Sequence, residues 1–346
     1  MSVPFTSVPQ PSALNPQPLL EVKDLKTYFF LREGTVRALD GVSFAIDRGE
    51  ALGVVGESGC GKSVTAQAIL RIVPAPGKIV DGEITLYQGA TGGTTPIRLT
   101  ELDPHGSRIR AIRGGEIAMV FQEPMTSLSP VHTVGAQIVE AIMLHQSVDR
   151  TEARARTIEI LSRVGMPRPQ QVVDAYPHQL SGGQRQRAMI AMALSCNPSL
   201  LIADEPTTAL DVTTQAQILD LMRHLQDELG MAIMFITHDL GVIAEMTTRV
   251  VVMYLGKVVE EADVDTLFHA PAHPYTRALL NSVPKLGMTS GALQPIEGSV
   301  PDPYNIPRGC PFHPRCPAFM PGKCDVAEPA WTQVGQRHYA RCHLYG

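Results

Sequence analysis

The hydrophobic and polar positions of this chain follow two periods. Short apolar runs, each bounded by turn-forming residues, predict strands at 20–22, 42–46, 51–55, 84–86, 117–120, 200–203, 232–236 and 250–253. Apolar residues at helical spacing predict helices over 63–73 and 214–229, and further helices between residues 122 and 177. Because strands alternate with helices, the pattern favours an α/β core with a largely parallel sheet.

Proline-rich segments bound this core on both sides. The first 18 residues hold five prolines among Ser, Gln and Asn, and predict a disordered tail that lacks the features of a signal peptide. Prolines recur after Ala270 and predict an extension over 271–346 that is irregular rather than more sheet, and too irregular to fold around an apolar core. No apolar run approaches the roughly 18–20 residues that span a bilayer, so any membrane role is expected to need a partner.

A glycine-rich loop follows the apolar run 51–55 directly. Residues 56–63 match the phosphate-loop pattern G-x-x-x-x-G-K-[ST]. A triphosphate needs many donors and little side-chain bulk, which glycines allow by letting backbone N–H groups approach it. In this pattern the lysine lies near the β- and γ-phosphates and the last hydroxyl binds Mg²⁺. The loop therefore predicts ATP and Mg²⁺ as cofactors, held by Gly56, Ser58, Gly59, Cys60, Gly61, Lys62 and Ser63.

Two carboxylates close the apolar run 200–203. Asp204 and Glu205 are successive residues at a strand end, so their side chains point in different directions. Asp204 suits a role in organising Mg²⁺, and Glu205 suits a general base that orients the attacking water. The pair therefore supplies the groups that hydrolysis of a bound ATP would need.

A third motif lies between the loop and the acidic pair, and reads Gln179-Leu180-Ser181-Gly182-Gly183-Gln184-Arg185-Gln186. The three motifs in this order resemble those of the ATP-binding cassette (ABC) ATPases. The resemblance implies an ABC-type nucleotide-binding domain over 19–270, in which a parallel-sheet core carries an antiparallel β part and an inserted helical subdomain at about 123–180.

The resemblance also implies roles for residues outside the three motifs. Gln122 matches the glutamine that senses Mg²⁺ and the membrane partner, and His238 matches the switch histidine that contacts the γ-phosphate. Asp211 matches the D-loop, in which Thr208 stands where serine is more usual. Adenine needs an aromatic face, for which Phe29 is favoured over Tyr28, although either ring could instead be part of the core.

The third motif raises a geometric question. Ser181, Gly182, Gly183 and Gln184 precede or open a helix expected over 185–195, which gives the chain a second anion-binding helix start. One γ-phosphate cannot lie at both helix starts of one chain if the helical subdomain separates them. In ABC ATPases the motif of one subunit closes over the ATP of the other, so the resemblance implies a dimer with ATP between the subunits.

A finer resemblance is to the ATPase subunits of dipeptide, oligopeptide and nickel importers. It rests on residues 121–130, 203–213 and 273–280, the last reading His-Pro-Tyr-Thr-Arg-Ala-Leu-Leu. The resemblance implies a peripheral subunit at the cytoplasmic face of the plasma membrane. Its implied partners are a second homologous ATPase, two transmembrane permeases and an extracytoplasmic substrate-binding protein.

The substrate and two rival functions stay open on the sequence alone. Peptides are favoured, with nickel, glutathione, opines or oligosaccharides as alternatives. A non-transport ABC ATPase acting on ribosomes or DNA is disfavoured because the chain has one cassette, and a net charge of −5 gives no footprint for nucleic acid. A subunit that binds ATP without turnover is disfavoured because Gln122, Ser181, Glu205 and His238 are all present.

Four cysteines crowd into the last 37 residues, at Cys310, Cys316, Cys324 and Cys342. In a chain expected in the cytosol this clustering favours metal over disulfides, and four thiolates suit either tetrahedral Zn²⁺ or a [4Fe–4S] cluster. The spacing C-x5-C-x7-C-x17-C lacks the C-x2-C pair of most zinc ribbons, which favours iron and sulfur. The importer resemblance favours the same cluster, and four unligated thiols are the remaining alternative.

Overall fold

Two sheets organise the molecule. The computed structural model describes residues 18–89, 95–122, 127–208, 210–282 and 296–346. In that part of the chain the strands form one sheet of eight and one of four, as expected for an ABC-type α/β fold. The predictions that concern residues 1–17, 123–126 and 209 lie outside the described residues.

The larger sheet has a parallel centre and an antiparallel edge. Five neighbouring strands, from β6 at one edge to β9, run parallel, and the last three continue the sheet by antiparallel pairing. In spatial order the strands are β6 (Ile117–Val120), β7 (Leu200–Asp204), β8 (Ala232–Ile236), β3 (Ala51–Val55), β9 (Arg249–Tyr254), β10 (Lys257–Asp263), β12 (His338–Arg341) and β11 (Trp331–Gly335).

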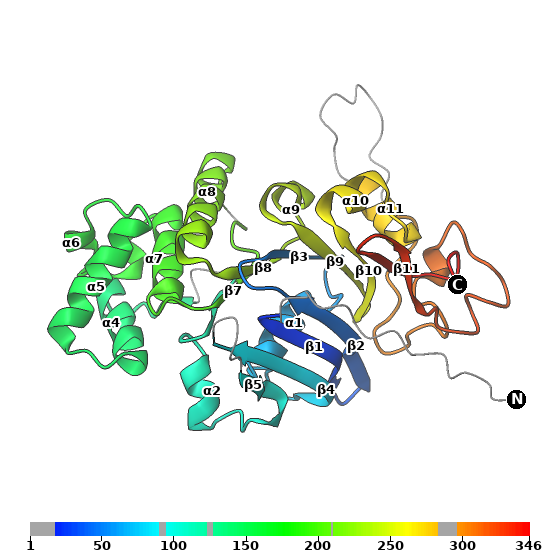
Figure 1. Ribbon diagram of the computed structural model, residues 1–346, viewed down its shortest axis with the longest axis horizontal. Coiled ribbons are helices and arrows are strands. Elements are labelled where there is room, and N and C mark those ends of the chain that lie inside the picture. The colour runs from blue at the N-terminus through cyan, green and yellow to red at the C-terminus, as the bar shows by residue number, and fades with distance from the viewer. Residues whose placement is uncertain (1–17, 90–94, 123–126, 209, 283–295) are drawn as a thin grey trace, which may run out of the picture.

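The smaller sheet is antiparallel and lies beside the parallel one (Figure 1). Its strands are longer than the apolar runs predicted, because each continues as an alternation of buried and exposed residues. Its strands, in spatial order, are β2 (Thr35–Ile46), β1 (Leu20–Phe30), β4 (Gly77–Gln88) and β5 (Thr95–Arg98).

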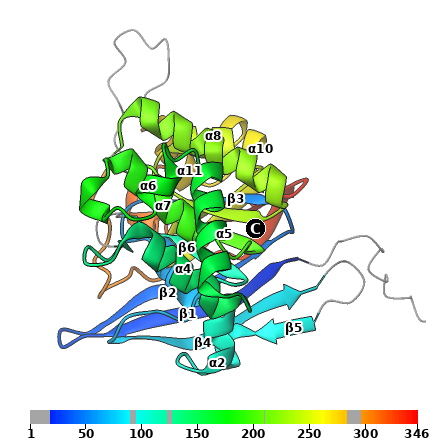
Figure 2. The same ribbon diagram turned by 90° about the vertical axis from the view of Figure 1, so that its left-hand side faces the viewer.

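Helices α4 to α7 form a separate group at one end of the molecule, opposite the C-terminal strands (Figures 1 and 2). Three of the four helices, α4, α5 and α7, carry a side-chain cap at their start, which satisfies free backbone N–H groups and explains where those helices begin. The group consists of α4 (Val134–His145, capped by Thr133), α5 (Arg150–Arg163, capped by Asp149), α6 (Pro169–Val172) and α7 (Gly182–Leu194, capped by Ser181).

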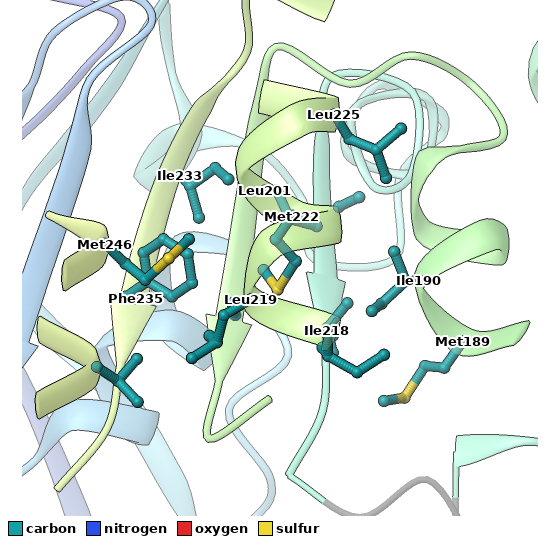
Figure 3. Packing of buried hydrophobic residues seen from close by; sticks show 14 of the residues in the cluster. Met189, Ile190, Leu201, Ile218, Leu219, Met222, Leu225, Ile233, Phe235 and Met246 are labelled. Carbon is teal, nitrogen blue, oxygen red and sulfur yellow. The ribbon is translucent and has the colours of Figure 1, made fainter. Parts of the chain in front are cut away.

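Helix α8 (Val212–Leu229) joins this group to the parallel sheet. Figure 3 shows Leu219 and Met222 of α8 near Leu201 and Ile233 of the sheet, while Ile218 is turned toward α7. All of these side chains are buried in one hydrophobic cluster. A shared core of this kind holds the helical group and the sheet together.

The described fold is completed by three short 3₁₀ helices, at Leu99–Glu101, Pro177–Gln179 and His313–Arg315, and by five further α-helices. These α-helices are α1 (Lys62–Ile69), α2 (Ser107–Ile112), α9 (Leu240–Met246), α10 (Val264–His269) and α11 (Pro274–Asn281). The helix expected over 63–73 ends at Ile69, before Arg71, which has a left-handed φ of 57°. The helix expected over 185–195 begins earlier, at Gly182, because the side chain of Ser181 caps it.

The prediction of an irregular C-terminal segment without further sheet was wrong. Strand β12 pairs with β10, β11 pairs with β12, and α11 is helical from Pro274 to Asn281. The prediction that the segment does not fold around an apolar core was also wrong, because Phe312 and Cys324 are buried in the main hydrophobic cluster. The two short strands follow the last proline of the chain, Pro329, so the prolines of this segment do not exclude them.

Candidate nucleotide-binding and hydrolysis site

The phosphate loop connects β3 to α1 and depends on glycine at two positions. Gly56 and Gly61 have φ values of 151° and 106°. A Cβ atom would lie 2.2 Å from the carbonyl oxygen of Met253 at position 56, and 2.5 Å from that of Ala38 at position 61. The loop can pack this closely only without side chains at these positions. Its backbone N–H groups then lie at the N-terminus of α1, where an anion can bind.

Lys62 lies under the phosphate loop. Its Nζ donates to the carbonyl oxygens of Gly56 at 2.8 Å and Glu57 at 3.1 Å, and the residue is only 8% exposed. Burial raises the pKa of the neighbouring Cys60 thiol, so that side chain is packing material, and only its backbone can serve a phosphate. The loop thus holds one cation in place for an anionic ligand.

Ser63 and Asp204 join the loop to the end of β7. The hydroxyl of Ser63 donates to Oδ1 of Asp204 at 3.1 Å. Burial raises the pKa of the Asp204 carboxyl, an effect that the hydrogen bond from Ser63 opposes. A hydroxyl and a carboxylate side by side are the oxygen ligands that Mg²⁺ prefers.

Replacing Asp204 tests this arrangement through stability. A folded-state pKa above the unfolded value means that the stability linked to this carboxyl is present at low pH and is lost as pH rises through the folded pKa. Asp204→Asn should therefore raise the melting temperature of the Mg²⁺-free protein at pH 7, with a difference that shrinks below about pH 4, and abolish Mg²⁺-dependent turnover. Asp174→Asn, at an exposed ion pair with Arg154, serves as the control. A melting temperature that does not rise at pH 7 contradicts the assignment.

Glu205 is the centre of the acidic site. Its Oε2 accepts hydrogen bonds from Nε2 of Gln122 and Oγ1 of Thr208, both at 2.9 Å, and its Oε1 lies 3.1 Å from Nδ1 of His238. The residue has a φ of 48°, and its N–H donates to the carbonyl of Ile236 at 2.7 Å. The carboxylate is therefore held in one orientation from three sides.

The surroundings keep this carboxylate ionised. Burial raises the pKa of Glu205, but the hydrogen bonds from His238 and Thr208 outweigh burial and lower it overall. Glu205 can therefore accept a proton from water at neutral pH. Of its partners, Gln122 and His238 were expected at the site, whereas the contact with Thr208 was not predicted. The signal in the sequence was a hydroxyl residue three positions after Glu205.

The residues of the third motif and the D-loop lie at helix starts. Ser181 and Gln184 form a reciprocal capping box at the start of α7, and Asp211 caps α8 through the N–H of Thr214 at 2.9 Å. A Cβ atom on Gly183 would lie 2.8 Å from the side chain of Thr214, so the two starts are in contact. The capping hydrogen bonds are local to each helix. The contact between Gly183 and Thr214 is what places the starts of α7 and α8 next to each other.

Two family models match the chain. The model described as "ABC transporter" matches residues 39–208, and the model described as "Oligopeptide/dipeptide transporter, C-terminal region" matches residues 259–324. The chain is 51% identical to the oligopeptide transport ATP-binding protein AppD of Bacillus subtilis, over 94% of this chain and 97% of that protein. The chain belongs to the ATP-binding proteins of the oligopeptide/dipeptide ABC transporters. It is also 45% identical to the dipeptide transport ATP-binding protein DppD of Escherichia coli, over 94% of this chain and 96% of that protein.

Solved structures agree with this family. The ABC cassette MJ0796, described as a dimer in a post-hydrolysis state bound to ADP and phosphate, superposes with a TM-score of 0.61 at 29% identity, over 71% of this chain and 98% of that one. The cassette cbiO1 of Clostridium perfringens gives 0.58 at 28% identity, over 73% and 91%. Across the described residues of this ABC ATPase, no helix combines the length and hydropathy needed to cross a membrane.

The two candidate adenine-stacking residues lie on opposite faces of β1 in this ABC ATPase. The hydroxyl of Tyr28 donates to Oδ1 of Asp40 at 2.8 Å, and the guanidinium of Arg37 lies 5.7 Å from its ring centroid. Phe29 packs on the other side, where a Cβ atom on Gly77 would lie 2.6 Å from its ring. The choice between the two rings stays a prediction.

The four C-terminal cysteines lie near one another in the ABC ATPase. Each pair among them is close enough for electrostatic interaction, and none of the four forms a disulfide. The pKa of Cys310 is raised to about 11 by burial, an effect that the backbone N–H of Phe312 opposes and the other three thiols reinforce. Within the described ranges, no three His, Cys, Asp or Glu side chains are placed to hold a single metal ion.

Sequence reasoning also missed contacts between the phosphate loop and the C-terminal segment. Glu57 of the loop contacts Tyr275 and Arg315, which lie 218 and 258 residues further along the chain. Glu57 occupies a variable position of the phosphate-loop pattern, so the pattern carries no signal for a partner. Only the fold brings these residues together.

Proposed function

We propose that this ABC ATPase powers the import of di- and oligopeptides through a membrane transporter. The observation that carries the proposal is the fixed, ionised carboxylate of Glu205 beside the Ser63–Asp204 pair, since this arrangement joins a general base to a magnesium site. Peptides are the proposed substrate because the oligopeptide and dipeptide proteins AppD and DppD match the chain over almost their whole lengths.

The proposed roles divide between the two ends of the ATP. Lys62 and the backbone N–H groups of the loop would bind the phosphates, and Ser63 and Asp204 would hold Mg²⁺ with Gln122 nearby. Glu205 would orient and deprotonate the attacking water, with His238 holding its carboxylate and facing the γ-phosphate. Phe29 or Tyr28 would stack on the adenine.

The proposed working unit is a dimer with a second, homologous ATPase. The starts of α7 and α8, with Ser181, Gly182, Gly183, Gln184 and Asp211, would close over the ATP bound to the partner. The dimeric cassette MJ0796, at 29% identity, supports this arrangement. We further propose two transmembrane permeases and an extracytoplasmic binding protein as partners, and a position at the cytoplasmic face of the membrane. The proposed division of the chain is a cassette domain over 19–270 followed by a C-terminal extension over 271–346.

Transport in a purified system tests the proposed function. Vesicles that contain the assembled transporter should accumulate labelled di- or oligopeptide only with ATP, and the Glu205→Gln complex should accumulate none. Nickel, glutathione and an oligosaccharide are the comparison substrates. Uptake of one of these in place of peptide contradicts the peptide assignment.

We also propose that the four cysteines hold a [4Fe–4S] cluster. Burial raises the pKa values of Cys310, Cys316 and Cys342, and such thiols become thiolates only beside a strongly positive group, which a metal centre supplies. The C-x5-C-x7-C-x17-C spacing, which lacks the C-x2-C pair of most zinc ribbons, supports the cluster over one tetrahedral Zn²⁺.

Metal analysis of anaerobically purified protein checks the cluster. We expect about four iron and four sulfide per chain, as the cluster's composition requires, with loss of both in Cys324→Ser. Cys196→Ser, at a cysteine outside the group, is the matched control. One zinc per chain without iron would contradict the cluster.

A further inference from the structure

The side chain of Glu57 in the phosphate loop is held by a residue of the C-terminal segment. Nη1 of Arg315 donates to Oε2 of Glu57 at 2.8 Å, and Nη2 donates to Oε1 at 3.1 Å. The backbone N–H of the same glutamate donates to the hydroxyl of Tyr275 at 2.8 Å. A bidentate guanidinium–carboxylate pair fixes both the position and the orientation of its partner.

Arg315 is itself fixed by backbone carbonyls. Its side chain is only 4% exposed, and its Nε donates to the carbonyl of Glu297 at 3.0 Å. Its Nη2 also reaches the carbonyl of Ile296 at 3.4 Å. These contacts keep the guanidinium of Arg315 in one place, so Glu57 is held by a fixed partner.

An aromatic cluster supports the same arginine. The rings of Tyr254, Tyr275 and Phe312 are fully buried, with centroids between 4.7 and 5.4 Å apart. The guanidinium of Arg315 lies 6.0 Å from the ring of Tyr254 and 5.9 Å from that of Phe312. Strand β9, α11 and the cysteine-containing segment thus meet behind the phosphate loop.

Glu57 also contacts the lysine of the loop. The carbonyl oxygen of Glu57 accepts a hydrogen bond from Nζ of Lys62 at 3.1 Å. The N–H, the carbonyl and the carboxylate of Glu57 therefore all have partners, and the chain of contacts runs from Arg315 through Glu57 to Lys62. A carboxylate in a loop that binds triphosphate would repel the ligand unless a cation neutralises it.

We propose that Arg315 is a positioning residue for the phosphate loop. Its guanidinium neutralises Glu57 and fixes the loop. Through this contact the C-terminal segment sets the affinity of this ABC ATPase for ATP. The proposal depends on ATP binding at the phosphate loop and is independent of the transported substrate and of the metal at the cysteines. It assigns to the C-terminal segment a part in the nucleotide site.

Equilibrium binding of MgATP to the full chain tests the proposal. Arg315→Gln should weaken ATP binding about tenfold, as expected for the loss of one charge-assisted contact, and should raise KM for ATP more than it lowers kcat. Adding Glu57→Gln should restore part of the affinity, because the unpaired carboxylate is then gone while the loop still lacks its fixed partner. Arg315→Lys should lie between the wild type and Arg315→Gln, since lysine keeps the charge but not the bidentate geometry.

Arg341→Gln is the matched control. Arg341 pairs with Glu328 in the same C-terminal segment, and the variant should keep the wild-type affinity. If Arg315→Gln lowers the melting temperature but leaves ATP affinity unchanged, the arginine is only structural and the proposal is wrong. The same holds if Glu57→Gln restores none of the affinity lost in Arg315→Gln.

Hydrogen exchange gives a test that does not depend on the arginine variant folding. Glu57→Gln alone breaks the ion pair while keeping the volume of the side chain. The amides of residues 56–61 should exchange faster in Glu57→Gln than in Arg341→Gln, because the loop has lost its fixed partner. Equal exchange of these amides in the two variants overturns the proposal.

Discussion

Glu205→Gln lowers ATP turnover of the assembled transporter by about 100- to 10,000-fold, the range for loss of a general base. The amide keeps the size of the side chain and can still contact Gln122, Thr208 and His238, but it cannot take a proton from water. ATP binding is expected to survive, so the variant should accumulate as an ATP-bound dimer, which size-exclusion chromatography with MgATP detects.

Glu101→Gln is the control for this result. Glu101 forms an exposed ion pair with Arg98 and is not a residue of the nucleotide site. Loss of this ion pair should leave turnover within the error of the wild type. Turnover of Glu205→Gln equal to that of Glu101→Gln would remove Glu205 from the base role.

Lys62→Met weakens ATP binding by about 100-fold or more. The change deletes the cation of the phosphate loop and leaves the carbonyl oxygens of Gly56 and Glu57 without their donor. Both losses act in a buried position, where charge-assisted hydrogen bonds are strong and unpaired polar groups are costly. Titration of the full chain with MgATP measures the effect.

Lys78→Met provides the comparison, because Lys78 is an exposed lysine of β4. It should bind ATP as the wild type does. Unchanged ATP affinity in Lys62→Met would show that the phosphates bind elsewhere, and would overturn the account of the loop.

The parallel strands could be predicted because each is buried on both faces. β7 and β8 are uninterrupted apolar runs, and their buried residues match the predicted strands almost residue for residue. β1 and β4 alternate buried and exposed positions with several polar residues, so the sequence predicted only their most apolar parts. The short β11 and β12 gave no apolar run at all, because exposed and half-buried residues alternate in β11, and buried and half-buried residues alternate in β12.

The candidate site divides in the same way. The phosphate loop is local, so its glycines, Lys62 and Ser63 could be located from their spacing, and the resemblance to ABC ATPases located Gln122 and His238. The hydrogen bonds between Gln122 and Glu205 or between Arg315 and Glu57 cross 83 and 258 residues, and no periodicity encodes them. Such contacts follow from the sheet order, which sequence patterns do not specify.

ATPase activity of the reconstituted transporter, with its permeases and binding protein, tests the central claim most directly. We predict that di- and oligopeptides stimulate hydrolysis, that nickel does not, and that Glu205→Gln removes the stimulated activity. Robust hydrolysis that no peptide changes would contradict the claim that this ABC ATPase powers peptide import.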